Sequence, residues 1–378
     1  MSEVYINAVA KFLPNEAVPN ERIESVLGMV NGQPSRARAI VLRNNQIKSR
    51  YYAIGADGKA SHTNAELTIE SVRQVLAIAG VAPEDVDLLS CGTSTPDQLL
   101  PAHASMVHGL WQNRPLEVNT NSGICTSGMN ALKYAFMAVR TGSAQRAVAT
   151  GSERVSSWLR ADKFSREAEK LAALQQNPMI AFDKDFLRWM LSDGAGAVLL
   201  SQHPNATGLS LKVHWVEGVS YAHEIEPCMY AGATKSNGGL TSWSDTDPDL
   251  WLEQSVFAIK QDIRLLETHI IAKGAESLRT ILDRKHVGEA EIDYFLPHIS
   301  SFVFKDKLRV GFERAGIDIP DHKWFINLDR FGNVGAASIY IQLEELFNSG
   351  TLAKGQKILL SVPESGRFSY VYSLLEVI

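Results

Sequence analysis

The chain repeats its own order of secondary structure, and this repetition restricts the available folds more than any other feature. After Asp87, a strand pattern leads to a turn of small residues around Cys125, and then to a helix pattern that closes at Gly142. After Asp293 the same order recurs and closes at Gly350, so the copies are offset by 206 residues at the aspartates and by 208 at the glycines. An offset this constant predicts a duplicated half-domain.

Strand and helix patterns alternate along the whole chain, which predicts an α/β fold. Glu66–Ile78 has the apolar spacing of an amphipathic helix, and the helix after Cys125 carries alanines on its remaining faces, as a helix buried on all sides would. We expect strands at Ala147–Thr150, Ala195–Leu200 and Trp324–Asn327, and a closing hairpin of Ile358–Pro363 with Phe368–Leu375. Together with the repeat, these elements predict two layered halves, residues 1–205 and 206–378.

Cys125 lies in the stretch Asn121–Met129, where a strand gives way to small residues and then to a helix. A cysteine in the first turn of a helix faces unpaired N–H groups and the positive end of the helix dipole, which favour the nucleophilic thiolate. A buried structural cysteine is the alternative. We predict a catalytic thiol because the second copy of the repeat supplies a histidine and an asparagine, His298 and Asn333, that could act with it.

Placing the first copy on the second puts Cys125 opposite Gly332–Asn333, and puts Ser90–Gly92 opposite Pro297–Ile299, which contains His298. If the halves pack about a pseudo-twofold axis, Cys125, His298 and Asn333 converge on one point. In such a set the thiol attacks, the imidazole moves protons or donates hydrogen bonds, and the amide supplies a second donor to a developing oxyanion or enolate.

The composition narrows the function without deciding it. There are 37 basic and 42 acidic residues, with both signs interspersed, so nothing indicates a nucleic-acid-binding protein. Three cysteines without a paired spacing predict neither a metal site nor a disulfide framework. The sequence has no signal-like start and no apolar run long enough for a membrane helix, so we expect a soluble, cytoplasmic protein.

Several motifs, taken in order, resemble those of thiolase-fold condensing enzymes, specifically the β-ketoacyl-ACP synthase III-like group. They are Thr95–Pro101, Gly123–Gly128, Gly151–Glu153, Ser192–Gly196, Pro297–His298 and Asn327–Ser338. The resemblance covers nearly the whole chain. It implies the thiolase fold, with duplicated α-β-α-β-α layered halves, and a homodimer.

The resemblance also implies an acyltransferase, a ketosynthase that joins two thioesters by Claisen-type condensation without a cofactor or metal. Cys125 would take an acyl group from a CoA or acyl-carrier-protein thioester, and His298 with Asn333 would stabilise the enolate of a malonyl-type or β-ketoacyl extender. Backbone N–H groups of Cys125 and Gly366 would hold the oxyanion.

The sequence departs from the family pattern in three places. His298 is followed by Ile-Ser-Ser, Glu364 and Arg367 add charge or bulk to the closing turn, and Val303 replaces an expected arginine. Carrier or CoA docking would then fall to the basic residues Arg43, Lys305, Lys307 and Arg309. A merely solvated basic face is the alternative.

These departures point to specialised lipid or polyketide metabolism. The chain is most similar to the subgroup that joins two longer acyl chains and cyclises the product to a cyclohexanedione or dialkylresorcinol precursor. Ring closure needs a further proton acceptor, and Glu153 is the candidate, with a structural role as the alternative. A thioester hydrolase and a non-catalytic partner subunit remain open. Hydroxymethylglutaryl-CoA synthase would need a glutamate where Gly92–Thr95 stands.

Two segments interrupt the alternation, Arg160–Met190 and Tyr221–Asp249. Inserted segments of this kind commonly carry specificity. The aromatic residues Trp243, Trp251 and Phe257 are expected either to line an apolar channel or to pack the insertion or a subunit interface.

Overall fold

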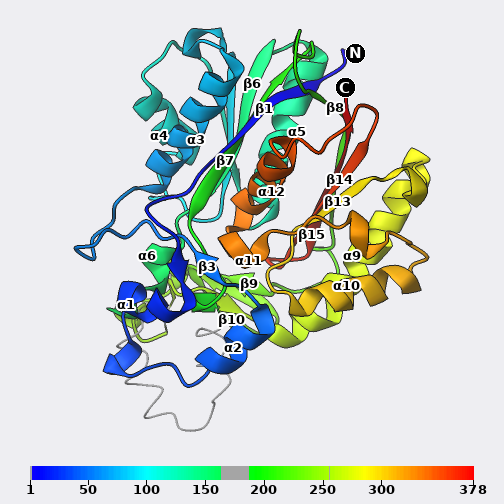
Figure 1. The fold of residues 1–378 in the computed structure, drawn as a ribbon. Helices are drawn as coiled ribbons and strands as arrows, with labels where there is room; N and C mark the ends of the chain where they lie inside the picture. The colour runs from blue at the N-terminus through cyan, green and yellow to red at the C-terminus, as the bar shows by residue number, and fades with distance from the viewer. Residues whose placement is uncertain (1, 163–186, 255) are drawn as a thin grey trace.

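A nine-stranded sheet forms the centre of the computed structural model, which describes residues 2–162, 187–254 and 256–378 (Figure 1). The strand order is β13-β14-β15-β8-β1-β7-β6-β4-β5. Its strands are β1 Tyr5–Phe12, β4 Leu88–Thr93, β5 Glu117–Ser122, β6 Arg146–Glu153, β7 Gly194–Ser201, β8 Leu211–Ser220, β13 Tyr294–Pro297, β14 Lys357–Glu364 and β15 Ser369–Val377. The N-terminal and C-terminal strands meet only between β1 and β8, where Tyr5 pairs with Lys212 and Ile6 with Leu211.

The two halves of this sheet pair their strands in the same way. Strand β4 is parallel to β6 as β13 is to β14, and β6 is antiparallel to β7 as β14 is to β15. Strands β1 and β8 then complete the two sets in equivalent places. The fold therefore agrees with the repeat in the sequence. The boundary after residue 205 lies in the connection between β7 and β8, and stays a prediction.

Helices divide the molecule into five layers. Helices α5 (Thr126–Thr141) and α12 (Ser338–Phe347) lie between the two sets of strands and contact both (Figure 1). Helices α3 (Asn64–Ala79) and α4 (His103–Trp111) cover the outside of the first set, and α9 (Ile263–Lys285) and α10 (Val303–Arg314) cover the second. The expected α-β-α-β-α layering is confirmed.

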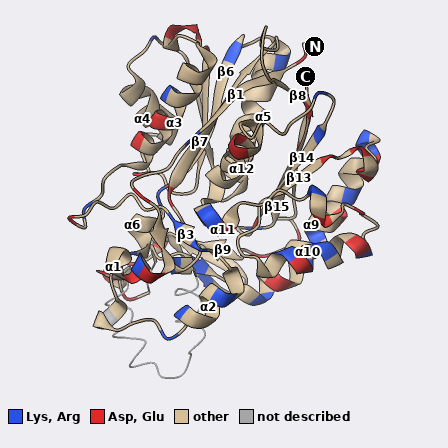
Figure 2. Ribbon diagram, viewed as in Figure 1, with Lys and Arg blue, Asp and Glu red and all other residues tan. Residues whose placement is uncertain are grey.

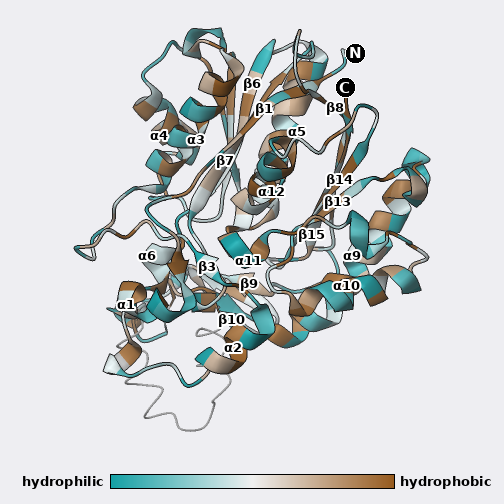
Figure 3. Cartoon of the chain, viewed as in Figure 1, coloured by the Kyte–Doolittle hydropathy of each residue, from teal (hydrophilic) through white to brown (hydrophobic). Residues whose placement is uncertain are grey.

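The hydrophobic pattern follows these layers. Figure 3 shows hydrophobic residues along the central strands, with hydrophilic residues interleaved on α9 and α10. Smaller elements cap the edge at which the site lies: α1 Ile23–Leu27, α2 Arg38–Asn45, α6 Ser156–Leu159, α11 Leu328–Phe331, β2 Val18–Pro19, β3 Ser49–Arg50, β9 Met229–Tyr230, β10 Ala233–Ser236, β11 Gly239–Ser242 and β12 Lys260–Gln261.

The predicted strand Trp324–Asn327 is wrong. Only Trp324 makes an isolated bridge to Phe295, and Phe325 donates one further backbone hydrogen bond to Phe295. The N–H of Trp324 donates back to Asp321 in the preceding 3₁₀ turn, and Asn327 already leaves the extended conformation as the N-cap of α11 (φ −126°, ψ 16°), so the pairing does not continue. The other predicted strands and the closing hairpin are confirmed as β6, β7, β14 and β15. Of the predicted insertion Arg160–Met190, residues 163–186 lie outside the described residues.

Two glycines allow the halves to meet closely. Gly128 on α5 and Gly151 on β6 both face the carbonyl oxygen of Ala336, which lies in the turn before α12. A Cβ at either position would lie 2.2 Å from that oxygen. The hydroxyl of Tyr340 on α12 donates a 2.8 Å hydrogen bond to the carbonyl of Gly128. These contacts fix the start of α5 against the start of α12.

We therefore predict that Gly128→Ala destabilises the fold by roughly 1–3 kcal/mol, because the added methyl group overpacks this junction. Gly109→Ala is the matched control, since Gly109 is also in a helix but has open space around its Cβ position. Helix propensity alone should make that variant more stable by about 0.5–1 kcal/mol. Urea unfolding measures both, and equal stability of Gly128→Ala and the wild type would contradict the close contact.

Candidate active site

Cys125 stands at the junction between β5 and α5. It is the N-cap residue of α5, and the turn before it is held by Ser127, whose N–H and Oγ both donate to the carbonyl of Ile124, at 3.0 and 2.7 Å. Cys125 is partly exposed, whereas Cys91 and Cys228 are buried. Access therefore singles out Cys125 as the thiol able to react.

His298 directly follows β13. Its backbone N–H donates a 2.8 Å hydrogen bond to Ser361 on β14, and only 4% of the residue is exposed. Burial lowers the pKa of the imidazole to about 4. At neutral pH the ring is therefore uncharged and carries one N–H donor.

Asn333 lies in the turn between α11 and α12. Its backbone N–H donates to Met190 at 2.9 Å, and its carbonyl accepts from the N–H of Ser192 at 2.9 Å. The side-chain Oδ1 accepts from the N–H of Gly335 at 2.9 Å. With Oδ1 engaged in this way, the amide nitrogen remains as the donor that Asn333 can offer to a substrate.

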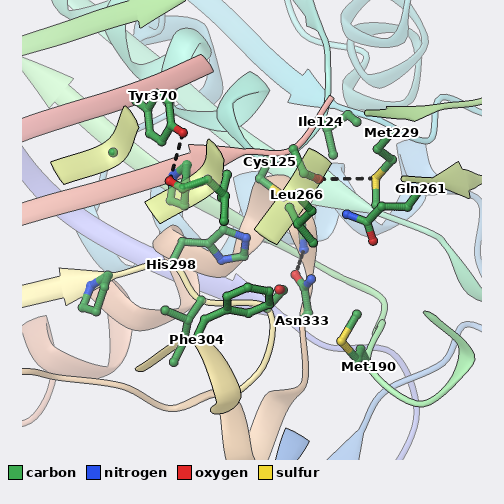
Figure 4. Close-up of a pocket in the computed structure, with 18 of the residues that line it drawn as sticks. Ile124, Cys125, Met190, Met229, Gln261, Leu266, His298, Phe304, Asn333 and Tyr370 are labelled. Carbon is green, nitrogen blue, oxygen red and sulfur yellow. Dashed lines mark hydrogen bonds between the residues drawn. The ribbon is translucent and has the colours of Figure 1, made fainter. Parts of the chain in front are cut away.

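One cavity brings the three residues together. Cys125, His298 and Asn333 all line it, and Figure 4 shows their side chains around a common space. Its empty volume is about 1100 Å³, part of which is open to solvent. The structure thus places the sequence-predicted thiol, imidazole and amide at one site.

Gly366 lies beside this cavity, in the turn between β14 and β15. A Cβ at Gly366 would lie 3.0 Å from Cδ1 of Ile124, the residue before the nucleophile. Its neighbour Ser365 lines the cavity, but Gly366 is not among the described lining residues. The turn is therefore close to Cys125, and the oxyanion role of its N–H stays a prediction.

The surroundings of Cys125 oppose ionisation, so the expected stabilisation of the thiolate is wrong for the resting site. Burial raises the pKa of the thiol, and the carboxylates of Glu153 and Glu364 raise it further. Among the described lining residues there is no lysine or arginine to counter them. The thiol rests protonated despite the helix N-terminus.

Glu153 is fully buried at the end of β6 and lines the cavity. Oε1 accepts from the N–H groups of Ser94 and Ala336, both at 3.1 Å, and Oε2 accepts from the Thr95 hydroxyl at 2.7 Å. These bonds connect the two halves of the chain. Burial raises the pKa of the carboxyl group to about 7, against these hydrogen bonds.

Two hydrophobic clusters form most of the remaining cavity wall. The first, here called the α9–α10 arm, contains Leu266, Ile270, Ile271, Phe304, Phe312, Tyr370 and Tyr372, with Gly274 beside Tyr370 and with Leu308 packed against both clusters. The second, here called the loop arm, contains Val155, Leu187, Met190, Leu191, Met229 and Ile259. In Figure 4, Tyr370 and Met229 lie on different sides of Cys125. The sequence analysis missed the α9–α10 arm, whereas Leu187, Met190 and Met229 of the loop arm lie in the two insertions that were expected to carry specificity.

The other predicted residues lie away from this space. Trp243, Trp251 and Phe257 contact one another, with ring centroids 5.5–6.0 Å apart, and they do not line the cavity as a channel would require. Phe257 is 51% exposed, so packing of the insertion or of a subunit interface stays a prediction. On α10, Lys305, Lys307 and Arg309 pair with Asp321, Glu267 and Glu313, at 3.3, 2.8 and 2.7 Å. Figure 2 shows both signs of charge along α9 and α10. Arg43 is exposed on α2.

No described helix is both long enough and apolar enough to cross a bilayer. Within the same residues, no group of three or more His, Cys, Asp or Glu side chains is arranged to hold a metal ion.

The raised pKa of Glu153 predicts a pH dependence of stability. A carboxyl group whose pKa is higher in the folded state stabilises that state fully below its unfolded value of 4.5, and this contribution is lost as the pH rises through about 7. Glu153→Gln does not lose stability in this way, because the glutamine side chain does not ionise. Between pH 5 and 8, its free energy of unfolding relative to wild type should therefore rise by up to about 3 kcal/mol. Urea unfolding at both pH values tests this, and a pH-independent difference would contradict it.

Two family models and a full-length relative match this chain. Residues 48–184 match the family model of the thiolase N-terminal domain, and residues 282–368 match that of the 3-oxoacyl-[acyl-carrier-protein] synthase III C-terminal domain. β-Ketoacyl-[acyl-carrier-protein] synthase III of Erythrobacter litoralis is 24% identical over 376 residues, which cover 99% of each chain.

Solved structures share the fold over the same length. The tetronic acid condensing enzyme AbyA1 superposes with a TM-score of 0.78 at 23% identity, covering 99% of both chains. OleA of Xanthomonas campestris, solved with lauric acid and lauroyl-CoA, gives a TM-score of 0.75 at 17% identity with the same coverage. The chain belongs to the thiolase-fold condensing enzymes related to β-ketoacyl-ACP synthase III, which are acyltransferases of the Claisen-condensing type.

Proposed function

We propose that this chain is a ketosynthase that holds an acyl group on Cys125 and joins it to a malonyl-type or β-ketoacyl thioester. The observation that carries the proposal is the cavity itself. Cys125, His298 and Asn333 line it together, and the walls beyond them are apolar. A thiol between two neutral hydrogen-bond donors suits a reaction in which negative charge develops on a carbonyl oxygen.

In the first step, Sγ of Cys125 attacks the carbonyl carbon of an acyl thioester. The bond to the CoA or carrier sulfur breaks, and the proton of the Cys125 thiol ends on that leaving sulfur. Backbone N–H groups of Cys125 and Gly366 would hold the oxyanion, since both lie beside Ile124 at the nucleophile turn. Such donors are fixed before the charge appears.

In the second step, a malonyl-type extender loses carbon dioxide, or a β-ketoacyl extender gives a proton to the carboxylate of Glu153, to form an enolate. The enolate oxygen accepts hydrogen bonds from the N–H of His298 and the amide of Asn333. The enolate carbon attacks the acyl-cysteine, a carbon–carbon bond forms, and Cys125 leaves as a thiolate that regains a proton. A neutral imidazole suits this step because it donates without a prior charge, and burial keeps His298 neutral.

The two apolar arms support a substrate pair with two alkyl chains. A small acyl group would leave both arms unfilled, whereas two longer chains would bury against them. We therefore place the enzyme in specialised lipid or polyketide metabolism, with cyclisation to a cyclohexanedione or resorcinol precursor. Glu153 is the proposed proton acceptor for ring closure, because it lines the cavity with a pKa of about 7. Its hydrogen bonds to both halves give it a structural role as well.

Acyl-CoA thioesters, an acyl carrier protein or both are the proposed partners, in the cytoplasm. Arg43 is the exposed basic residue proposed for docking, because Lys305, Lys307 and Arg309 already pair with carboxylates. A homodimer is proposed through β5. This strand is one of the two edge strands of the sheet, and its Val118 is 38% exposed.

Intact-protein mass spectrometry tests the nucleophile. After exposure to acyl-CoA thioesters of eight to sixteen carbons, we expect an acyl adduct on the wild type and none on Cys125→Ala. The adduct should persist until an extender thioester is added, whereas a thioester hydrolase would release free acid without one. Cys91→Ala is the control, because Cys91 is buried and should leave labelling unchanged. An unlabelled wild type would favour the partner-subunit alternative.

Filling each arm should separate the two substrates. Ile270→Phe narrows the α9–α10 arm and Met229→Phe narrows the loop arm, with one added ring each. We expect one variant to lose acylation of Cys125 by long-chain thioesters, and the other to acylate normally but to lose condensation by roughly ten- to a hundredfold. Acetyl-CoA is the control substrate, as it should be unaffected. Identical behaviour of both variants would contradict two separate chain sites.

A further inference from the structure

Glu364 is the last residue of β14, and its carboxylate lies at the first turn of α5. The Thr126 hydroxyl donates a hydrogen bond to Oε2. The two oxygens of this carboxylate lie between the turn that precedes Cys125 and the turn that contains Gly366. A Cβ atom added at Gly123 would lie 3.6 Å from Oε2, and one added at Gly366 would lie 2.6 Å from Oε1. The carboxylate therefore fills the space between the nucleophile turn and the closing turn.

This position opposes a thiolate at Cys125. Helix α5 has sixteen residues, and its N-terminus would attract negative charge. A carboxylate already at that end satisfies this attraction and repels a second anion beside it. Burial is the largest cause of the raised pKa of Cys125; among the described residues, the carboxylates of Glu153 on β6 and then Glu364 on β14 raise it further, while buried His298 is neutral.

Glu153 and Glu364 occupy equivalent places in the duplicated fold. Each is the last residue of an eight-residue strand, β6 in one half and β14 in the other. Each bonds the start of the central helix that belongs to the opposite half. Glu153 accepts from Ala336 before α12, and Glu364 accepts from Thr126 on α5. Glu153 is fully buried, whereas Glu364 is only partly buried.

We propose that Glu364 is a positioning residue that occupies the N-terminus of α5 and keeps the resting nucleophile protonated until a thioester enters. The inference concerns the free enzyme and goes beyond the proposed condensation. It has two consequences. Cys125 resists alkylating and oxidising agents despite its exposure, and its proton leaves only as the bond to the substrate carbon forms.

The test is the rate of alkylation of Cys125 by iodoacetamide, an uncharged probe, between pH 6 and 10. Mass spectrometry of the peptide that contains Cys125 separates it from Cys91 and Cys228. We expect Glu364→Gln to react roughly tenfold faster than wild type throughout this range, because its plot of log rate against pH is displaced about one pH unit lower. Glu364→Asp restores the charge and should return most of the wild-type profile.

Thr126→Val is the matched control, because it removes the hydrogen bond to Glu364 but keeps the carboxylate. It should retain a profile close to wild type. A Glu364→Gln profile that is unchanged, or shifted to higher pH, would overturn the proposal, as would Thr126→Val reacting as fast as Glu364→Gln. Thermal unfolding confirms that each variant is folded. If Glu364→Gln does not fold, the test rests on whether Glu364→Asp keeps most of the wild-type profile. The assay contains no thioester, so failure of acyl transfer would leave its outcome intact.

Discussion

The contact between the starts of the two central helices determines where every site residue lies. Gly128 and Gly151 approach the carbonyl of Ala336 so closely that no side chain fits between them. This brings the first turn of α5, which follows Cys125, against the turn that carries Asn333. Because α5 and α12 are covered by strands on both sides, neither can shift without disturbing the shared core. The site inherits its geometry from the best-packed region of the molecule.

The second property of this site is that its thiol and its imidazole are both uncharged, and this follows from the same packing. The imidazole of His298 is neutral and the thiol of Cys125 is protonated, both because they are surrounded by protein. The nucleophile and the imidazole donor are therefore uncharged at rest, although the carboxylates of Glu153 and Glu364 lie beside them. The proposed reaction then creates negative charge first on an oxyanion and later on an enolate, and in both cases fixed N–H donors receive it. Preorganised neutral donors in an apolar cavity suit this sequence better than a permanent ion pair, which would favour one anionic state throughout.

The repeat in the sequence predicts the layers. It also places Cys125, His298 and Asn333 in loops at equivalent positions of the two halves, because the same order of strands and helices puts these loops at the same edge of the sheet. It could not predict the two arms. Their residues come from distant segments, such as Met190, Leu266 and Tyr370, and only side-chain direction decides that they face one space. The strand at Trp324–Asn327 is wrong because a periodic pattern does not show how many residues the neighbouring turns consume. The thiolate expectation is wrong because burial of the thiol, together with the carboxylates of Glu153 and Glu364 that tertiary structure brings beside it, outweighs the helix N-terminus.

Duplication explains why those carboxylates come as a pair. Strands β6 and β14 hold equivalent positions, and each ends in a glutamate that reaches across to the opposite central helix. The two have diverged in environment rather than in identity. Glu153 is enclosed and held by three donors, so its proton can exchange near neutral pH, whereas Glu364 stands at the more open turn beside the nucleophile. Equivalent positions in the two halves thus carry two acids around one thiol, and the complete burial of Glu153 distinguishes it, as the group able to accept a proton, from the partly buried Glu364.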